Sequence, residues 1–111
     1  MPIVIRHFDH DNVANGGSFS KTWTAERDYT IKYFLIKRKD GASFTKSTIT
    51  VWINGEPMTR DVALCNTFGS DKMNALEVDW DLPKDGELKY EGKNFEGAAV
   101  DIAVELVLIP K

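Results

Sequence analysis

Apolar and polar residues alternate in several short runs of this chain, and that period of two restricts the fold more than any other feature. In the last run, single residues separate Val100, Ile102, Val104, Leu106 and Leu108. Successive side chains of a β-strand point to opposite faces of a sheet, whereas a helix places residues three or four apart on one face. The alternation therefore predicts half-buried strands of the kind found in antiparallel sheets.

Glycine-based turn signals separate these runs. Asn54-Gly55 and Asp85-Gly86 are dipeptides that tolerate a positive φ and favour tight hairpin turns. We predict strands over Ile3–Phe8, Ser18–Thr24, Tyr29–Lys37, Ser47–Asn54, Val62–Thr67, Ala75–Leu82, Glu87–Tyr90 and Ala98–Ile109. Short strands between frequent turn signals are typical of a sandwich or barrel. We therefore expect an all-β fold, a single-domain antiparallel β-sandwich of about eight strands that is jelly-roll-like and spans residues 1–111.

The face on which each apolar residue falls predicts the core. Residues two apart along a strand share a face, and we take the more apolar face as the buried one. The predicted core consists of Ile31, Leu35, Ile49, Val51, Val78, Trp80, Val100, Ile102 and Val104.

Other apolar residues fall on the opposite, outer face, which a lone sandwich leaves towards water. They are Phe34, Ile36, Trp52, Val107 and Ile109. Another subunit, a covering loop or a register error of one residue would each account for them. We expect the first, and predict these residues as the interface of a homo-oligomer or of docking on a larger protein assembly. Trp52 has further alternatives, because an exposed indole can also stack on a sugar ring or lie under a loop.

Charge and cysteine content exclude several classes of partner. The chain carries 14 Lys and Arg against 17 Asp and Glu, a net charge of −3, whereas proteins that bind nucleic acid usually carry a basic excess. We therefore expect no nucleic acid and no membrane as partner, and the chain also lacks the long apolar run of a membrane-spanning helix. The single cysteine, Cys65, allows no disulfide within the chain, and Arg6 interrupts the start too early for a secretory signal. These features predict a virion or cytoplasmic location, without secretion through a signal peptide.

Two groups of residues have the chemistry of metal ligands. The first consists of His7, Asp9, His10 and Asp11, and the second of Glu77, Asp79 and Asp81. Imidazole with carboxylate suits zinc, and carboxylates suit calcium, but neither group has the spacing of a metal motif. We expect a polar loop and a solvated strand face instead, with no metal, no cofactor and no catalytic residue, and we predict that the protein is not an enzyme. Whether either group binds metal stays open.

A further indication comes from the order of features along the chain. A polar Gly-rich entry is followed by the segment Thr22–Ile31, a strand that ends in Asn54-Gly55, the run Leu82–Leu88 and a long apolar final strand. In this order the chain resembles the small jelly-roll and related β-sandwich proteins that occur in virus particles as minor capsid, decoration or spike components. The resemblance implies a structural role, assembly into symmetric oligomers and no catalytic residues.

Two functions from different classes follow. We expect a non-catalytic structural or assembly protein, a virion component of the minor capsid or decoration type that acts through protein–protein contacts. The alternative is a carbohydrate- or ligand-binding β-sandwich module, in which an exposed aromatic side chain with polar neighbours takes a sugar.

Overall fold

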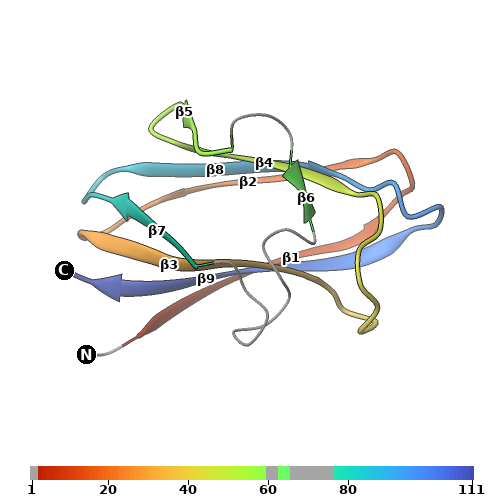
Figure 1. The fold of residues 1–111 in the computed structure, drawn as a ribbon, viewed down its shortest axis with the longest axis horizontal. Coiled ribbons are helices and arrows are strands. Elements are labelled where there is room, and N and C mark those ends of the chain that lie inside the picture. The colour runs from red at the N-terminus through yellow and green to blue at the C-terminus, as the bar shows by residue number, and fades with distance from the viewer. Residues whose placement is uncertain (1–2, 60–62, 66–76) are drawn as a thin grey trace.

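Most of the described chain is β-strand. The computed structural model describes residues 3–59, 63–65 and 77–111 (Figure 1). The strands are β1 (Val4–Val13), β2 (Ser18–Thr24), β3 (Tyr29–Arg38), β4 (Thr48–Ile53), β5 (Glu56–Pro57), β6 (Ala63–Leu64), β7 (Glu77–Leu82), β8 (Glu87–Lys93) and β9 (Val100–Pro110). The predicted strand Val62–Thr67 is described only at 63–65, where β6 forms, and residues 75–76 of Ala75–Leu82 lie outside the described residues. These residues contain no helix that is long and apolar enough to cross a membrane.

Two antiparallel sheets pack face to face (Figure 1). The strand order is β1-β9-β3-β7 in the first, which we call sheet A, and β2-β8-β4-β5 in the second, sheet B, where β6 also pairs with β4. The first four strands alternate between the two sheets. Near the end of the chain, β8 lies between β2 and β4 in sheet B, and β9 lies between β1 and β3 in sheet A. This is the strand order of a jelly roll. The expected all-β, jelly-roll-like sandwich is therefore confirmed.

The predicted Asn54-Gly55 turn joins β4 to β5. Its two residues have φ angles of 51° and 79°, and the flanking Ile53 and Glu56 pair with each other. Positive φ at both central positions defines the type I′ hairpin turn, whose twist matches that of the strands. The turn therefore lies at the end of β4, beside the first residues of β8, with which β4 pairs.

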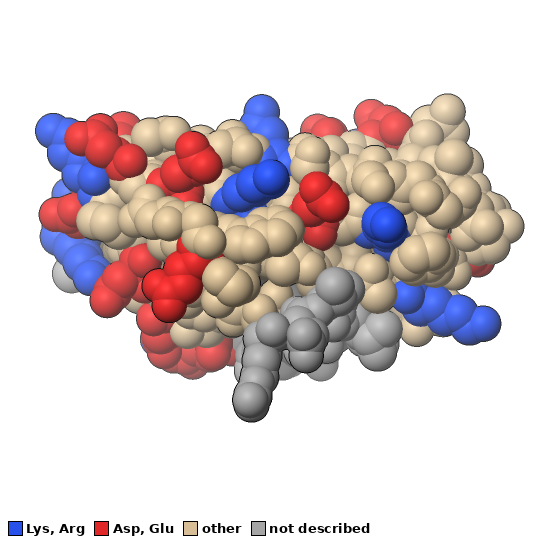
Figure 2. Space-filling view, turned by 90° about the horizontal axis from the view of Figure 1, so that it is seen from above, with Lys and Arg blue, Asp and Glu red and all other residues tan. Residues whose placement is uncertain are grey.

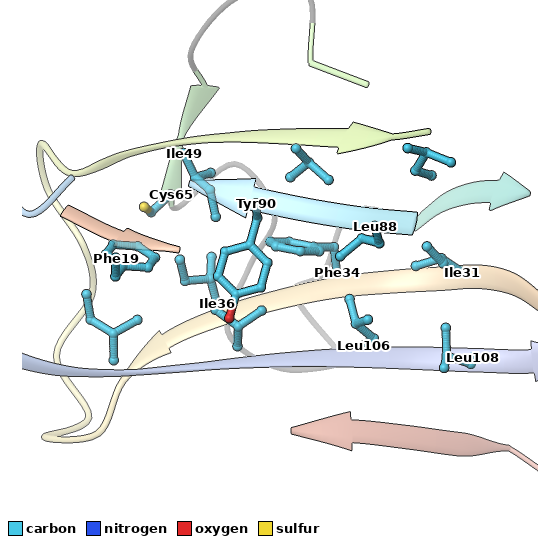
Figure 3. Packing of buried hydrophobic residues seen from close by; sticks show 14 of the residues in the cluster. Phe19, Ile31, Phe34, Ile36, Ile49, Cys65, Leu88, Tyr90, Leu106 and Leu108 are labelled. Atoms are coloured by element: carbon cyan, nitrogen blue, oxygen red, sulfur yellow. The ribbon is translucent and has the colours of Figure 1, made fainter. Parts of the chain in front are cut away.

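The core lies between the two sheets and is rich in aromatic rings (Figure 3). Tyr29, Phe34 and Tyr90 are among its largest fully buried side chains. Six predicted core residues belong to it, namely Ile31, Ile49, Val51, Val100, Ile102 and Val104, and the half-buried Val78 and Trp80 pack against it. Most of the core prediction is therefore confirmed.

A β-bulge in β3 reverses the predicted faces of the second half of that strand. Ile31 pairs with Leu108 of β9, but Tyr33 pairs with Val107, so Lys32 is an extra residue without its own partner on β9. Such an insertion turns every later side chain to the other face. Phe34 and Ile36 consequently lie in the core, 0% and 1% exposed, and their prediction as outer-face interface residues is wrong. Leu35 is buried as predicted, 5% exposed, but it lies on the outer face of the sheet and not in the core cluster between the sheets.

Candidate interface and ligand site

The middle of the outer face of sheet A is apolar but already covered. Val107 of β9 lies between Ile5 of β1 and Tyr33 of β3, on the outer face as predicted. Val107 and Leu35 lie outside the core cluster, yet only 3% and 5% of their surface is exposed in the single chain. The chain itself therefore covers this part of the sheet, and no second subunit is needed to explain it.

Exposed apolar residues remain where β1 begins. Ile3 immediately precedes β1 and is 51% exposed, and Ile5 is 57% exposed. Ile5 lies opposite Val107, and the half-buried Ile109 follows two residues later on the same face of β9. We call Ile3, Ile5 and Ile109 the apolar strip. One residue of the strip, Ile109, is a predicted interface residue, and it lies on the outer face as predicted.

The two halves of β1 differ in how their free edge is protected. Among the described strands β1 pairs with β9 alone, so its other backbone edge is open. Its second half has a register shift between His10 and Val13, and Lys39 holds the carboxylates of Asp9 and Asp11 at 2.9 and 2.6 Å. Bulges and charges are the usual means by which edge strands resist pairing with other chains. The first half has no bulge, and Ile5 of the apolar strip is exposed there beside Arg6, which pairs with Glu26 at 2.7 Å.

His7, Asp9, His10 and Asp11 lie within strand β1 and not in the polar loop expected for them, and they are divided between the two faces of the sheet. On the outer face, His7 contacts Asp9 at 2.7 Å and Glu105 at 3.3 Å, and Lys37 contacts Glu105 at 2.9 Å. The hydrogen bond from Lys37 lowers the pKa of Glu105. These carboxylates are therefore engaged by cationic side chains of the protein.

The carboxylate ladder on β7 is engaged in the same way. The ammonium group of Lys32 contacts Glu77 and lies 3.0 Å from Asp79, and that of Lys111 lies 2.5 Å from Asp81. Hydrogen bonds to Glu77 and Asp79 raise the pKa of Lys32, so it stays charged. Within the described ranges, no three His, Cys, Asp or Glu side chains gather as a metal site would require.

His10 points inward, away from the other members of its group. Its Nε2 atom lies 2.5 Å from the hydroxyl of Tyr90, and its ring packs against the rings of Tyr90 and Phe19. Burial, followed by the nearby charge of Lys21, lowers the pKa of His10, and burial raises the pKa of Tyr90. At neutral pH an uncharged imidazole therefore satisfies the hydroxyl of a buried tyrosine.

This contact predicts a loss of stability in mild acid. The folded state binds a proton at His10 less readily than the unfolded chain does, so this contribution is present above the ordinary pKa of 6.5 and is lost as the pH falls below it. We expect His10→Gln, which keeps a hydrogen-bonding group, to flatten the decline in melting temperature between about pH 7 and 5 by a few degrees. A wild-type profile equal to that of His10→Gln would contradict the prediction.

Cys65 is not a candidate nucleophile. Its side chain is fully buried in the core (Figure 3), and burial raises the pKa of its thiol to about 12. The reactive form of cysteine is the thiolate. At neutral pH this thiol stays protonated and packs as a small apolar group.

Trp52 lies on the outer face of sheet B, as predicted, but in polar surroundings. It is half-buried between Lys89 of β8 and Pro57 of β5, and the ammonium of Lys89 lies 5.4 Å from the centre of the indole ring. Phe34 and Ile36, which the alternation assigns to an outer face like Trp52, belong to the core. Figure 2 looks onto this side of the molecule and shows basic and acidic side chains intermixed over it.

A shallow hollow opens beside the indole. It has a volume of about 430 Å³ and is lined by Trp52, Gly55, Glu87 and Lys89. An aromatic ring, a carboxylate and an ammonium group thus meet in one depression. Alternation along β4 identifies Trp52 but not its charged neighbours, because these lie on β8, which pairs with β4 but is far from it in sequence.

A buried carboxylate at the other end of the sandwich also escaped prediction. Glu96, in the β8–β9 connection, accepts hydrogen bonds from the backbone N–H groups of Thr45, Lys46 and Ser47 at 2.9–3.0 Å, and from the Ser47 hydroxyl at 2.7 Å. Arg38 lies 3.5 Å away. Burial alone would raise the pKa of Glu96, but these hydrogen bonds outweigh it and lower the pKa to about 2. Glu96 therefore ties the β3–β4 connection to the β8–β9 connection.

The fold and the surfaces described above are the features of this protein that bear on its function. No protein-family model matches the chain, and no curated protein matches its sequence. Jelly-roll sandwiches occur as viral capsid domains and as lectin domains. Because function resides in sites and not in the fold, the outer faces of the two sheets must distinguish between such roles.

Proposed function

We propose that this chain is a non-catalytic assembly protein, a structural component of a protein particle such as a virion, that associates with copies of itself. The observation that carries this proposal is the apolar strip at the start of edge strand β1, where Ile3 and Ile5 are more than half exposed. The jelly-roll strand order supports a role in a particle by analogy, since viral capsid domains share this fold. The proposal requires no cofactor, and it places the protein in the virion or in the cytoplasm where a particle assembles.

A second copy is the partner that best fits an open strand edge. Most soluble oligomers are homo-oligomers, and a two-fold axis brings the same patch of both subunits together. Pairing of the two edges satisfies backbone N–H and C=O groups, each bond contributing about 0.5–1.5 kcal/mol. Covering four half-exposed isoleucines, two from each copy, adds about 3–6 kcal/mol. Since association costs at least about 4 kcal/mol in lost freedom, one such contact is weak, and repetition in a lattice strengthens it.

The expected result is a dimer, or a larger species, that forms with rising concentration and is lost when the strip gains a charge. Ile5→Lys should weaken association at least about ten-fold, because it removes apolar contact and adds a charge of the kind that guards natural edges. Sedimentation equilibrium measures the change. Phe95→Lys is the matched control, since Phe95 is 43% exposed and lies in the β8–β9 connection, far from the start of β1 (Figure 1).

Two outcomes would contradict the assembly role. One is a wild-type chain that stays monomeric at about 1 mM, where even a contact of about 4 kcal/mol would be half populated. The other is equal weakening by Ile5→Lys and Phe95→Lys, which would mean that association does not use the apolar strip.

A further inference from the structure

The hollow beside Trp52 lies on the sheet opposite the apolar strip and is not used in the proposed assembly. Its walls come from three places, the end of β4, the turn after it and the first residues of β8. Trp52 contributes an indole, Glu87 a carboxylate and Lys89 an ammonium, while Gly55 contributes backbone without a side chain. The volume of about 430 Å³ falls in the range of small-molecule sites.

The walls are held together by hydrogen bonds that fix their geometry. The backbone N–H of Asn54 donates to the carbonyl of Glu87 at 2.8 Å, and the Asn54 side-chain oxygen accepts from the backbone N–H of Glu87 at 2.9 Å. These two bonds tie the β4–β5 turn to β8. The backbone of Glu87 is therefore held in place beside the turn, and a site whose backbone is already placed loses less freedom on binding.

The chemistry of the walls indicates one class of ligand. The exposed part of an indole packs against a flat apolar surface, while a carboxylate accepts and an ammonium donates hydrogen bonds. A pyranose ring offers both, because its C–H groups form an apolar face and its hydroxyls surround the rim. One negative and one positive group line the hollow, so a strongly charged ligand of either sign would meet a like charge.

We propose that this hollow is a binding subsite for a neutral sugar residue. The sugar ring packs on Trp52, Glu87 accepts hydrogen bonds from one or two hydroxyls, and Lys89 donates to a ring or hydroxyl oxygen. Thr50 lies two residues before Trp52 on the same face, and Thr22 pairs with Lys89 in register. Both extend a polar surface away from the hollow, along which a longer saccharide can lie.

Lys89 has two roles in this arrangement. In the free protein its ammonium lies over the indole ring, 5.4 Å from the ring centre. An exposed cation–π contact of this kind is weak, and the lysine stem is long and flexible. A sugar can therefore displace the ammonium from the ring face and receive a hydrogen bond from it, without any change in the backbone.

The experiment uses methyl glycosides of glucose, galactose, mannose and N-acetylglucosamine, together with cellobiose and maltose, as probes. Saturation-transfer NMR detects binding and titration calorimetry measures it. We expect at least one probe to bind with a Kd of about 1–10 mM, as a single open subsite allows. Trp52→Ala should weaken that binding at least about ten-fold, and Glu87→Gln about three-fold or more. Phe95→Ala, which removes a comparable exposed ring elsewhere, should leave it unchanged.

Three results would overturn the subsite. They are the absence of binding by every probe at about 50 mM, binding that survives both Trp52→Ala and Glu87→Gln, and equal loss in Phe95→Ala. Circular dichroism and melting temperature establish that each variant is folded, and Glu87→Gln, at an exposed position, tests the site even if Trp52→Ala does not fold. Ile5→Lys should keep the sugar affinity of the wild type, so this inference and the assembly proposal fail or survive independently.

Discussion

Phe34→Ala is expected to lower the free energy of unfolding by about 3–5 kcal/mol, the range for deleting a buried phenylalanine side chain. Phe34 is fully buried, and its ring lies 5.7 Å from that of Tyr90 and 6.4 Å from that of Trp80. The substitution removes the contact of Phe34 in sheet A with Tyr90 in sheet B. It also leaves a cavity that the surrounding side chains can only partly fill. Urea denaturation followed by circular dichroism measures the loss.

Tyr33→Ala is the matched control for this prediction. Tyr33 is the adjacent aromatic residue, it is half-buried, and it lies outside the core cluster. Its loss should cost clearly less than that of Phe34, by at least about 2 kcal/mol. The opposite order would place Tyr33 in the core and Phe34 outside it, and the bulge at Lys32 would then be wrong.

The bulge also shows which parts of the fold can be predicted from the sequence. In β9, Asp101 and Glu105 alternate with apolar residues, so the charged positions identify the outer face unambiguously. In β3 the run from Tyr33 to Ile36 is apolar at every position, and nothing in it distinguishes one face from the other. A one-residue insertion at Lys32 therefore leaves no trace in the pattern, although it reverses four side chains.

The candidate site shows a second limit, which comes from topology. The alternation assigns Trp52 correctly to an outer face, because the residues that alternate with it are apolar. Its neighbours depend on which strands pair, and a hairpin of β3 with β4 would place Phe34 beside it. In this jelly roll β3 and β4 lie in opposite sheets, so β3 contributes Phe34 to the core while β8, the neighbour of β4, supplies Glu87 and Lys89. Such pairings join segments far apart in sequence, and local patterns do not contain them.

Glu96 illustrates the same limit for connections between strands. Its partners, Thr45 to Ser47, precede it by about 50 residues, and its own surroundings, with Asn94 before it and Gly97 after it, read as an ordinary polar loop. A carboxylate that accepts several backbone N–H groups is recognisable only when the two connections are seen together. Its importance can nevertheless be tested directly.

Glu96→Gln is expected to lower the free energy of unfolding at pH 7 by about 3 kcal/mol. The side chain of Glu96 is only 2% exposed, and its pKa lies near 2 in the folded protein against an ordinary value of 4.5. That difference corresponds to about 3 kcal/mol in favour of the charged form. Glutamine keeps the shape but replaces one acceptor oxygen with a donor, which then faces other N–H donors. Urea denaturation at pH 7 gives the loss, and Glu91→Gln, an exposed carboxylate on β8, should change stability by less than about 0.5 kcal/mol.

The lowered pKa of Glu96 also predicts that the folded state loses stability in acid. Between about pH 4.5 and 2 the unfolded chain protonates Glu96 while the folded protein does not, so its contribution is complete above this window and is lost as the pH falls through it. The difference in stability between wild type and Glu96→Gln should therefore shrink from about 3 kcal/mol at pH 7 towards zero near pH 2. Taking the difference cancels the titration of other carboxylates whose pKa is lowered, such as Asp9 and Glu105. A difference that stays constant over this range would show that the loss comes from the donor group that glutamine introduces and not from the missing charge.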